Sequence, residues 1–539
     1  MLHSATGVAP AAAKSKLVLE QATAALQAGD RGDAERLLRA HLLEQPRDTA
    51  ALAKLVDIAL EDKRIEEATI LLRRAVSADP SSRLGLFLVS HLKTFAGPGV
   101  ALKELETLPP AVRGSFDGRA TEAALLGILG EHDREIAIYE DLVEFQPSNP
   151  SLWKTLGDAL KTVGRTDDAV TALRRAIDAR PTYGEAFWTL SNFKSFRFTD
   201  RDISAMNRAL RGKLSEADAL HFHFALGKAY EDRDAYPQSF KHYDHGNRIR
   251  AGSMSPELMR VTRFTDVAIA TFTPALFERH AGAGCEAPDP IFVLGLHRSG
   301  STLVEQILAS HPKIEGTTEI TIMQQLWDRL GRIAANTGRG TFQEIARLNS
   351  TELEAIGAEY LERTRPFRLT DRPYFVDKLP ANWMNLGLIR LALPKAKIID
   401  ARRHPMACGF SNFKQHYAAG VTFSYSLDSI GHFYRDYERF MAHIDRVQPG
   451  AVHRILNEHL IDDPEGEVRR MLDYLGLPFD PACLEFHRNT RAVSTPSAEQ
   501  VRRPINRDGV DYWRRYEPWL GPLKAALGEA LESWDVPAQ

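Results

Sequence analysis

A glycine-rich stretch near the middle of the chain has the residue types and the spacing of a phosphate-binding loop. Residues 295–302 read Gly-Leu-His-Arg-Ser-Gly-Ser-Thr, follow a short apolar run at 291–294 and precede an amphipathic helical pattern. A buried strand, a glycine loop and a helix start in this order point backbone N–H groups and the positive end of a helix dipole at one anion. The sequence therefore predicts a phosphate site here.

The residue after the second glycine argues against an ATP-type loop. Gly295 and Gly300 have the spacing of that motif, but the motif requires a lysine next, and Ser301 stands there instead. The basic residue lies inside the loop, at Arg298. We therefore expect a ligand whose phosphate bears no long polyphosphate tail.

Basic residues also follow two later strand patterns. Lys378 ends one apolar run, and Arg402 and Arg403 follow another, with Ser411 eight positions after Arg403 on a predicted helix. The carboxyl ends of parallel strands face the ligand crevice of an α/β sheet. A guanidinium can bind a phosphate through a fork of donors and a hydroxyl adds a directional donor, so Arg403 and Ser411 are candidates for binding an anion. The alternative is an arginine-rich strand end whose side chains make unrelated ion pairs. Of the two arginines, we assign Arg402 a structural role.

These motifs together resemble the signatures of sulfotransferases that use 3′-phosphoadenosine 5′-phosphosulfate (PAPS). The likeness is to protein-tyrosine sulfotransferases and to bacterial relatives with helical repeats. It implies that Glu319 is the catalytic base, that Lys378 contacts the bridging oxygen of the leaving phosphate, and that Arg403 and Ser411 clasp the 3′-phosphate. The resemblance assigns the 5′-phosphate and the sulfonate to Arg298, Ser299, Gly300, Ser301 and Thr302.

The segment 492–516 resembles the family's C-terminal loop, which closes over the cofactor. The resemblance places Ser497 beside the sulfonate and gives the loop positive charge through Arg503. Two positions depart from the family's pattern. Asn457 stands where relatives often have a tyrosine that touches the cofactor, and Tyr512 stands where they commonly carry a basic residue.

The resemblance implies in-line transfer of a sulfonate group to a hydroxyl on a protein tyrosine or a small compound. Adenosine 3′,5′-bisphosphate would be the product, and no metal is expected. A degenerate P-loop kinase or NTPase is one alternative, because Asp400 follows an apolar strand as a Mg²⁺-binding acid would. A non-catalytic repeat adaptor with a sulfotransferase-like fold is another.

The first half of the chain has an internal repeat. Pro46 and Pro80 delimit one period of 34 residues, and Pro147 and Pro181 delimit another, which is the tetratricopeptide spacing. Each hairpin buries its face only against its neighbours, so several are needed, and we expect about six. The array would bind a peptide or protein acceptor on its concave side. Alternatively, it is a scaffold that packs against the catalytic domain or drives formation of a homodimer.

The predicted fold class is multidomain. Residues 14–250 form an all-α tetratricopeptide solenoid, 251–287 a connecting helix and linker, and 288–539 a P-loop-like α/β sulfotransferase domain with a parallel sheet. A chain of 539 residues is long enough for this organisation.

Composition excludes several other classes. The net charge of −3 gives no bulk basic field for nucleic acid. No apolar run is long enough to span a membrane, and the first residues lack the apolar core of a signal peptide. The three cysteines, Cys285, Cys408 and Cys483, have no metal or disulfide spacing, which suits a reducing compartment. We therefore expect a cytoplasmic protein with no nucleic-acid or membrane partner.

Overall fold

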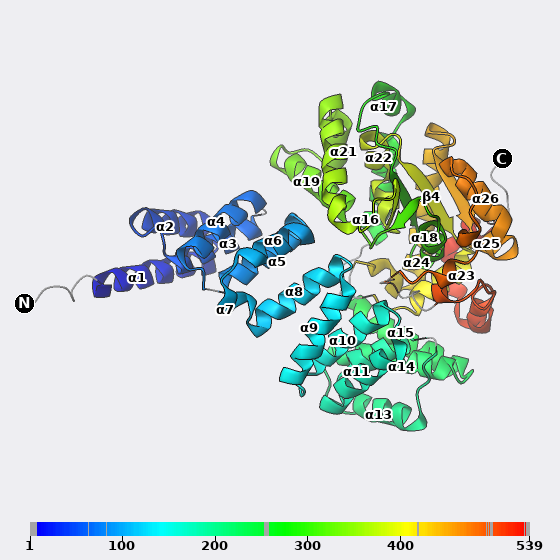
Figure 1. Ribbon diagram of the computed structural model, residues 1–539, viewed down its shortest axis with the longest axis horizontal. Helices are drawn as coiled ribbons and strands as arrows, with labels where there is room; N and C mark the ends of the chain where they lie inside the picture. The colour runs from blue at the N-terminus through cyan, green and yellow to red at the C-terminus, as the bar shows by residue number, and fades with distance from the viewer. Residues whose placement is uncertain are drawn as a thin grey trace, which may run out of the picture. The chain divides into compact units, whose positions relative to one another are not determined.

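The chain divides into two compact units, Met1–Leu142 and Val143–Gln539. Figure 1 shows its computed structural model. The structure describes residues 8–62, 64–81, 83–193, 195–252, 258–417, 420–491, 493, 495, 500–532 and 534.

The first unit is a run of helices joined by short turns. Each helix pair closes on small buried residues: Ala34 and Ala68 are completely buried, and Leu38 and Leu72 fill the layer beside them. Alanine at these points lets two helices approach closely, as the repeat pattern predicts. The helices are α1 (Val8–Gln27), α2 (Arg31–Glu44), α3 (Thr49–Glu61), α4 (Ile65–Ala78), α5 (Leu84–Phe95), α6 (Pro98–Thr107), α7 (Pro110–Arg113), α8 (Phe116–Ile128) and α9 (His132–Phe145).

The repeat pattern is degraded between α6 and α9, and the structure shows how packing is kept there. Pro109 and Pro110 start the extra short helix α7. Glu135 stands where the repeat has a small residue, and its carboxylate packs against Gly127. A Cβ built on Gly127 would lie 2.4–2.6 Å from that carboxylate. The larger side chain of Glu135 on α9 is therefore accommodated by Gly127 on α8.

The second unit begins with more hairpins of the same kind. They are α10 (Pro150–Thr162), α11 (Thr166–Ala179), α12 (Gly184–Ser191), α13 (Asp200–Leu210), α14 (Glu216–Glu231) and α15 (Tyr236–Gly252). The connecting segment contains two helices, α16 (Leu258–Thr271) and α17 (Pro274–Arg279). The side chain of Thr273 accepts a hydrogen bond from the backbone N–H of Leu276, and Pro274 occupies the first turn, so a new helix starts there.

A five-stranded sheet follows, in the order β2-β3-β1-β4-β5, and every pairing in it is parallel. The strands are β1 (Pro290–Gly295), β2 (Ile314–Gly316), β3 (Tyr374–Lys378), β4 (Lys397–Arg402) and β5 (Val452–Leu456). β1 lies at the centre, where its neighbours cover both edges. The predicted fold class, helical repeats followed by a parallel α/β domain, is confirmed.

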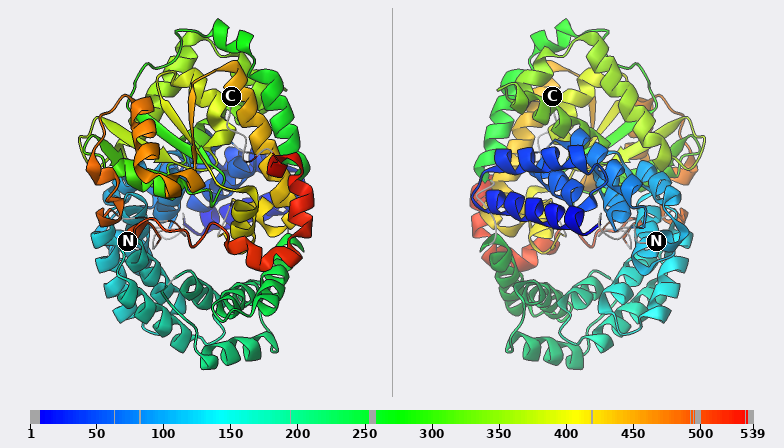
Figure 2. Two further views of the ribbon diagram at one scale, coloured as in Figure 1. Left: turned by 90° about the vertical axis from the view of Figure 1, so that its right-hand side faces the viewer. Right: turned by 90° about the vertical axis from the view of Figure 1, so that its left-hand side faces the viewer.

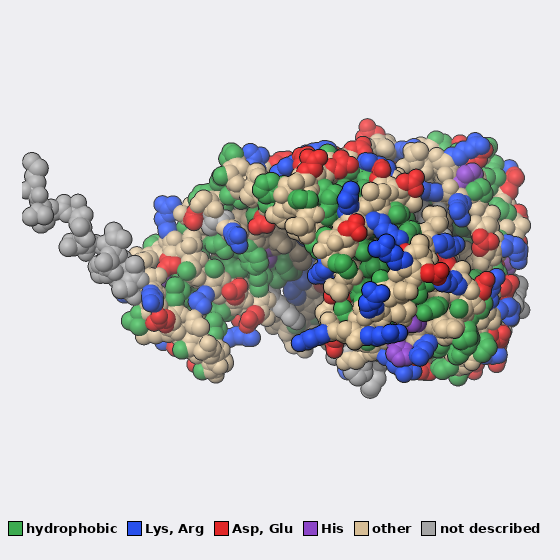
Figure 3. Space-filling model, turned by 90° about the horizontal axis from the view of Figure 1, so that it is seen from below, with side chains coloured by type: hydrophobic (Ala, Val, Ile, Leu, Met, Phe, Trp, Pro, Cys, Tyr) green, Lys and Arg blue, Asp and Glu red, His purple; other side chains and the backbone are tan. Residues whose placement is uncertain are grey.

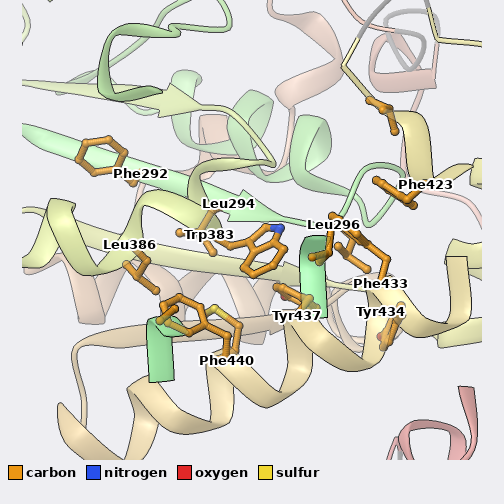
Figure 4. Packing of buried hydrophobic residues seen from close by; sticks show 14 of the residues in the cluster. Phe292, Leu294, Leu296, Trp383, Leu386, Phe423, Phe433, Tyr434, Tyr437 and Phe440 are labelled. Carbon is orange, nitrogen blue, oxygen red and sulfur yellow. The ribbon is translucent and has the colours of Figure 1, made fainter. Parts of the chain in front are cut away.

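Alternate residues of β1 feed two separate cores, because side chains of a strand point to opposite faces. Ile291 and Val293 pack with α18 and α26, whereas Phe292 and Leu294 pack with α22 and α24. Figure 4 shows Leu294 near Trp383 of α22, with Phe292 farther back along the same strand. Figure 2 shows the helices on both faces of the sheet. The strand is therefore buried on both sides, as its continuous apolar run predicts.

The remaining helices cover these two faces or extend the C-terminal end. They are α18 (Ser301–Ala309), α19 (Ile322–Asn336), α20 (Thr341–Arg347), α21 (Ser350–Thr364), α22 (Asn382–Ala392), α23 (Pro405–Phe413), α24 (Leu427–Val447), α25 (Asn457–Asp462), α26 (Pro464–Leu475), α27 (Gly521–Leu527) and α28 (Glu529–Glu532), with a 3₁₀ segment at Tyr512–Trp519.

Acidic and basic side chains are interspersed over the face shown in Figure 3, in keeping with the small net charge. Among the described residues, no helix is both long enough and apolar enough to cross a membrane.

Candidate active site

The loop between β1 and α18 has the backbone of an anion cradle. Gly295, Arg298 and Gly300 all have positive φ, at 140°, 68° and 99°. A left-handed conformation costs a non-glycine residue about 1–3 kcal/mol and concentrates at functional sites, so Arg298 is held there by its surroundings. Helix α18 starts at Gly300, which has no side chain to cap the first N–H groups. Those N–H groups therefore point toward any anion in the loop.

The sheet brings the predicted basic residues to one edge. Val293 of β1 pairs with Lys378 of β3, and Gly295 of β1 pairs with Ala401 of β4. All three strands run parallel, so their carboxyl ends meet on the same side. Lys378 and the Arg402–Arg403 pair consequently flank the phosphate loop.

The two predicted anion pockets adjoin each other. Arg298 Nε donates to Ser411 Oγ at 3.1 Å, and Arg403 Nη1 donates to the carbonyl oxygen of Arg298 at 3.4 Å. Arg403 Nη2 donates to the carbonyl oxygen of Gly509. Burial, with the nearby charge of Arg298, lowers the pKa of Arg403. Its Nε is buried with no partner among the described residues, which leaves a donor for an anion.

The preceding arginine has a different environment. Arg402 Nε lies 2.7 Å from Asp400 Oδ2, and its guanidinium lies 5.2 Å from the ring of Tyr437. Asp400 is completely buried and also accepts a hydrogen bond from Tyr437. Asp400 is therefore engaged in the protein interior rather than directed at the loop, which removes the observation that favoured a kinase.

Lys378 lies between two carboxylates. Its Nζ is 2.5 Å from Glu319 Oε1 and 3.8 Å from Glu305 Oε2. Lys378 and Glu305 are 1% and 3% exposed, whereas the Glu319 side chain is 45% exposed. Glu305 also binds Arg491 Nη2 at 2.8 Å. The exposed carboxylate can meet an acceptor, and the buried one holds the lysine.

Sequence reasoning missed Glu305, Arg491 and His297. A helical periodicity count would have flagged Glu305, because it lies one turn after Ser301 on the helix that follows the loop. His297 lies in the loop, and burial lowers its pKa to about 4, with Lys378 and Arg298 adding to the shift against Glu319. Its ring centroid lies 5.5 Å from that of Tyr417. A neutral, aromatic-flanked imidazole is therefore part of this site.

Two adjoining cavities, of about 140 Å³ and about 300 Å³, lie beside the loop. Both are lined by Arg298, Arg403 and Arg503. The first also has an apolar wall; its members are Leu303, Ile461, Phe486, Val501, Ile505 and Val510. The second is predominantly charged. Ser299 and Lys378 line neither cavity, and Ser497 lies outside the described residues.

The two positions that depart from the family's pattern both lie at these cavities. Asn457 lines the first, and its Oδ1 would lie 2.7 Å from a Cβ built on Gly300, so it packs directly on the loop. Tyr512 lines the second, with Lys414 Nζ 4.5 Å from its ring centroid. Lys414, which follows the last residue of α23, therefore places a cation beside Tyr512, the position at which the family's pattern commonly has a basic residue.

The segment after Arg491 passes close to a repeat hairpin. The backbone N–H of Val493 donates to the carbonyl oxygen of Thr162 at 3.3 Å, and Arg502 Nη2 donates to the same oxygen at 3.2 Å. Thr162 ends α10, so the turn of one repeat hairpin contacts both Val493 and Arg502.

Comparisons with known proteins agree with this geometry. Residues 290–481 match the family model described as "Sulfotransferase family", and residues 19–83 and 151–183 match tetratricopeptide repeat models. The second half of the chain is therefore similar to the sulfotransferase family, and parts of the first half are similar to tetratricopeptide repeats. The matched region of this domain contains the loop, Lys378, Arg403 and Ser411.

Relatives with and without an assigned activity share these regions. A protein of Aquifex aeolicus (strain VF5) is 28% identical over 401 residues, covering 72% of this chain and 52% of the relative. The chain thus spans about half the length of that relative. Protein-tyrosine sulfotransferase 1 of Danio rerio is 27% identical over 267 residues, covering 44% of this chain and 71% of the relative.

Among solved structures, the sulfotransferase domain from the Synechococcus PCC 7002 olefin synthase is 21% identical, with a TM-score of 0.35, and covers 47% of this chain and 97% of its own. The family match itself supports a sulfotransferase-like function for the second half of the chain. Among the residues that the structure describes, no group of three or more His, Cys, Asp or Glu side chains is arranged to hold a metal ion.

Proposed function

We propose that this protein transfers the sulfonate group of PAPS to a hydroxyl acceptor and releases adenosine 3′,5′-bisphosphate. One observation carries the proposal: Arg298 and Arg403, from separate motifs 105 positions apart, line the same two cavities. In the reaction, the bond from sulfur to the 5′-phosphate oxygen breaks, a bond from sulfur to the acceptor oxygen forms, and the acceptor proton leaves.

The residues present fit such a nucleotide. The apolar wall of the first cavity suits an adenine ring, and the loop with its helix start suits the 5′-phosphate. The unpartnered Nε of Arg403 and the cationic lining of the second cavity suit a further phosphate.

Each predicted residue has a role in this proposal. Arg298, with the backbone of residues 299–302, holds the 5′-phosphate and the sulfonate. Arg403, Ser411 and Arg503 hold the 3′-phosphate. PAPS supplies an activated sulfonate, and the protein supplies orientation and charge neutralisation, which are the main terms in transfer of such charged groups.

Glu319 accepts the acceptor proton in this scheme, and Lys378 neutralises the oxygen that leaves. The pair is already in contact, and because the ammonium group has three N–H donors, Lys378 can keep this contact while another N–H donates to the leaving oxygen. A phenol has a pKa near 10, and a carboxylate is a weak base for it, so deprotonation has to be concerted with transfer.

The proposed acceptor is a hydroxyl on a peptide or protein, with tyrosine as the first candidate, because the domain is similar to a protein-tyrosine sulfotransferase. We keep the division into a repeat array (14–250), a connecting segment (251–287) and a catalytic domain (288–539) as part of this proposal. The three cysteines are all free thiols, which suits a cytoplasmic location.

Nucleotide binding and sulfonate transfer test the proposal. By calorimetry without Mg²⁺, the full chain is expected to bind adenosine 3′,5′-bisphosphate more tightly than ATP. With ³⁵S-labelled PAPS, it is expected to label tyrosine peptides. Tighter binding of Mg²⁺–ATP would favour a kinase instead. Selective binding of the bisphosphate without sulfonate transfer to peptides, phenols or alcohols would instead support the hypothesis of a non-catalytic repeat adaptor.

A further inference from the structure

The repeat hairpins of the second unit pack directly against the sulfotransferase-family domain. Ser239 Oγ of α15 lies 2.8 Å from Tyr516 Oη, and Asn247 Nδ2 donates to the carbonyl oxygen of Phe413 at 2.8 Å. Between these contacts, α14 forms one wall of the charged cavity of about 300 Å³. The repeats therefore contribute side chains to the site itself.

Lys228 of α14 faces this cavity. It also lines a small adjoining cavity of about 30 Å³ together with Arg298, Ser411 and Lys414. The side chain of Lys228 is 12% exposed and pairs with Asp232 one turn later. Lysine is almost never this buried unless it is paired, and Lys228 also lines both cavities together with Lys414 and Arg298.

Cations outnumber acids around this cavity. Lys414 Nζ lies 2.9 Å from Glu231 Oε1, yet the pKa of Lys414 is lowered, by burial and then by the charges of Lys228 and Arg298 against that of Glu231. Six arginine or lysine side chains line the cavity against three acidic ones. A doubly charged anion would relieve the repulsion among them.

The position of the cavity indicates which anion. It shares Arg298, Arg403 and Arg503 with the apolar cavity, and the Arg298–Ser411 hydrogen bond of 3.1 Å lies at the junction. A nucleotide with its base in the apolar cavity and its 5′-phosphate in the loop would direct a ribose phosphate into the charged cavity.

We propose that Lys228 of the repeat array, with Lys414, binds the 3′-phosphate of the nucleotide. This inference rests on the proposed function. It makes the last repeat hairpins a part of the nucleotide site, so that the array selects for the ribose phosphate in addition to any role in acceptor binding.

The test compares two nucleotides on the full chain. Calorimetry gives the Kd of adenosine 3′,5′-bisphosphate and of adenosine 5′-monophosphate for the unchanged protein and for Lys228→Met. We expect Lys228→Met to weaken bisphosphate binding about tenfold, the loss of one charge-assisted hydrogen bond. Monophosphate binding is expected to stay unchanged. Lys228→Arg should keep most of the bisphosphate preference, and Lys241→Met, a matched change on the exposed side of α15, should keep all of it.

Three results would overturn the inference. If Lys228→Met weakens the binding of both nucleotides equally, the substitution distorts the site as a whole. If the preference for the bisphosphate is undiminished, Lys228 does not contact the 3′-phosphate. An increase in acceptor KM alone would assign the cavity to the acceptor. If Lys228→Met fails to fold, Lys228→Gln is judged by the same ratio of Kd values. If the unchanged protein shows no bisphosphate preference, the proposed function itself fails, independently of Lys228.

Discussion

Lys378 and Glu319 form an ion pair, with Nζ 2.5 Å from Oε1, across the carboxyl edge of the sheet. One member is buried on β3 and the other is nearly half exposed, so they differ in what they can reach. The buried lysine can contact only what enters the loop, whereas the exposed carboxylate can also meet an acceptor. The pairing joins the two proposed chemical roles in one contact.

Glu319→Gln is expected to remove the base and leave the nucleotide site intact. We expect kcat for sulfonate transfer to fall by about 10²–10⁴, the usual contribution of a general base. The Kd of adenosine 3′,5′-bisphosphate should not change, because Glu319 lines neither cavity. Glu465→Gln, an exposed carboxylate on α26, is the control. Full activity in Glu319→Gln would assign the proton transfer to another group.

Glu305→Gln is expected to lower kcat by misplacing Lys378. Glu305 lies 3.8 Å from Lys378 and 2.8 Å from Arg491, so the variant leaves the buried Lys378 and the partly buried Arg491 with less opposing charge. Breaking a buried pair costs about 3–5 kcal/mol, and thermal unfolding should show a lower Tm.

A double-mutant cycle separates positioning from stability. If Glu305 acts through Lys378, the effect of Glu305→Gln on kcat should disappear in a Lys378→Met background, because effects within one unit are not additive. Independent effects on kcat that simply multiply would argue against this coupling, whatever happens to Tm.

The neighbouring arginines should give opposite phenotypes. Arg402→Gln leaves Asp400 buried without its partner at 2.7 Å, so we expect a loss of stability of about 3–5 kcal/mol and an unchanged nucleotide preference. Arg403→Gln removes a guanidinium from both cavities. We expect bisphosphate affinity to fall about 10–100-fold and Tm to change little. Tm of each variant and its ratio of bisphosphate to monophosphate Kd check this prediction; exchanged phenotypes would reverse the two assignments.

Local signals were sufficient for the loop and for most of the sheet. The apolar runs of β1, β3 and β4 are buried because helices cover both faces of the parallel sheet, whereas the edge strand β5 has only Ile455 buried. β2 has only three residues, too few to form a recognisable pattern, so it was not predicted. The basic residues at strand ends were predictable because parallel strands end at one edge.

The rest of the site depends on contacts between distant segments. Glu305 and Arg491 are 186 positions apart and Glu231 and Lys414 are 183 apart, so no local pattern relates either pair. In the sequence, nothing distinguishes Lys228 from other lysines of the repeats; only the placement of α14 against the loop does so. Lys228 of the repeat hairpins lines the same cavity as Arg298 and Arg403, which spacing within either half could not indicate.

The paired histidines of α14 and α15 should make the second unit sensitive to acid. His223 Nδ1 and His242 Nδ1 lie 3.0 Å apart, and burial, together with the charge of neighbouring His245, lowers the pKa of each to about 4. The folded protein therefore keeps both rings neutral down to about pH 4, while the unfolded chain takes up protons below about 6.5. The free energy of unfolding should consequently fall as pH falls from about 6.5 to about 4, by at most about 3 kcal/mol per histidine.

Calorimetric Tm values between pH 7 and pH 5 check this. His242→Gln removes one titrating group, so the decline in Tm should be shallower than in the unchanged protein. His459→Gln, at an exposed position on α25, should decline as the unchanged protein does. A Tm that is flat across this range in the unchanged protein would mean that the two rings are already protonated, or equally hydrated, in the folded state.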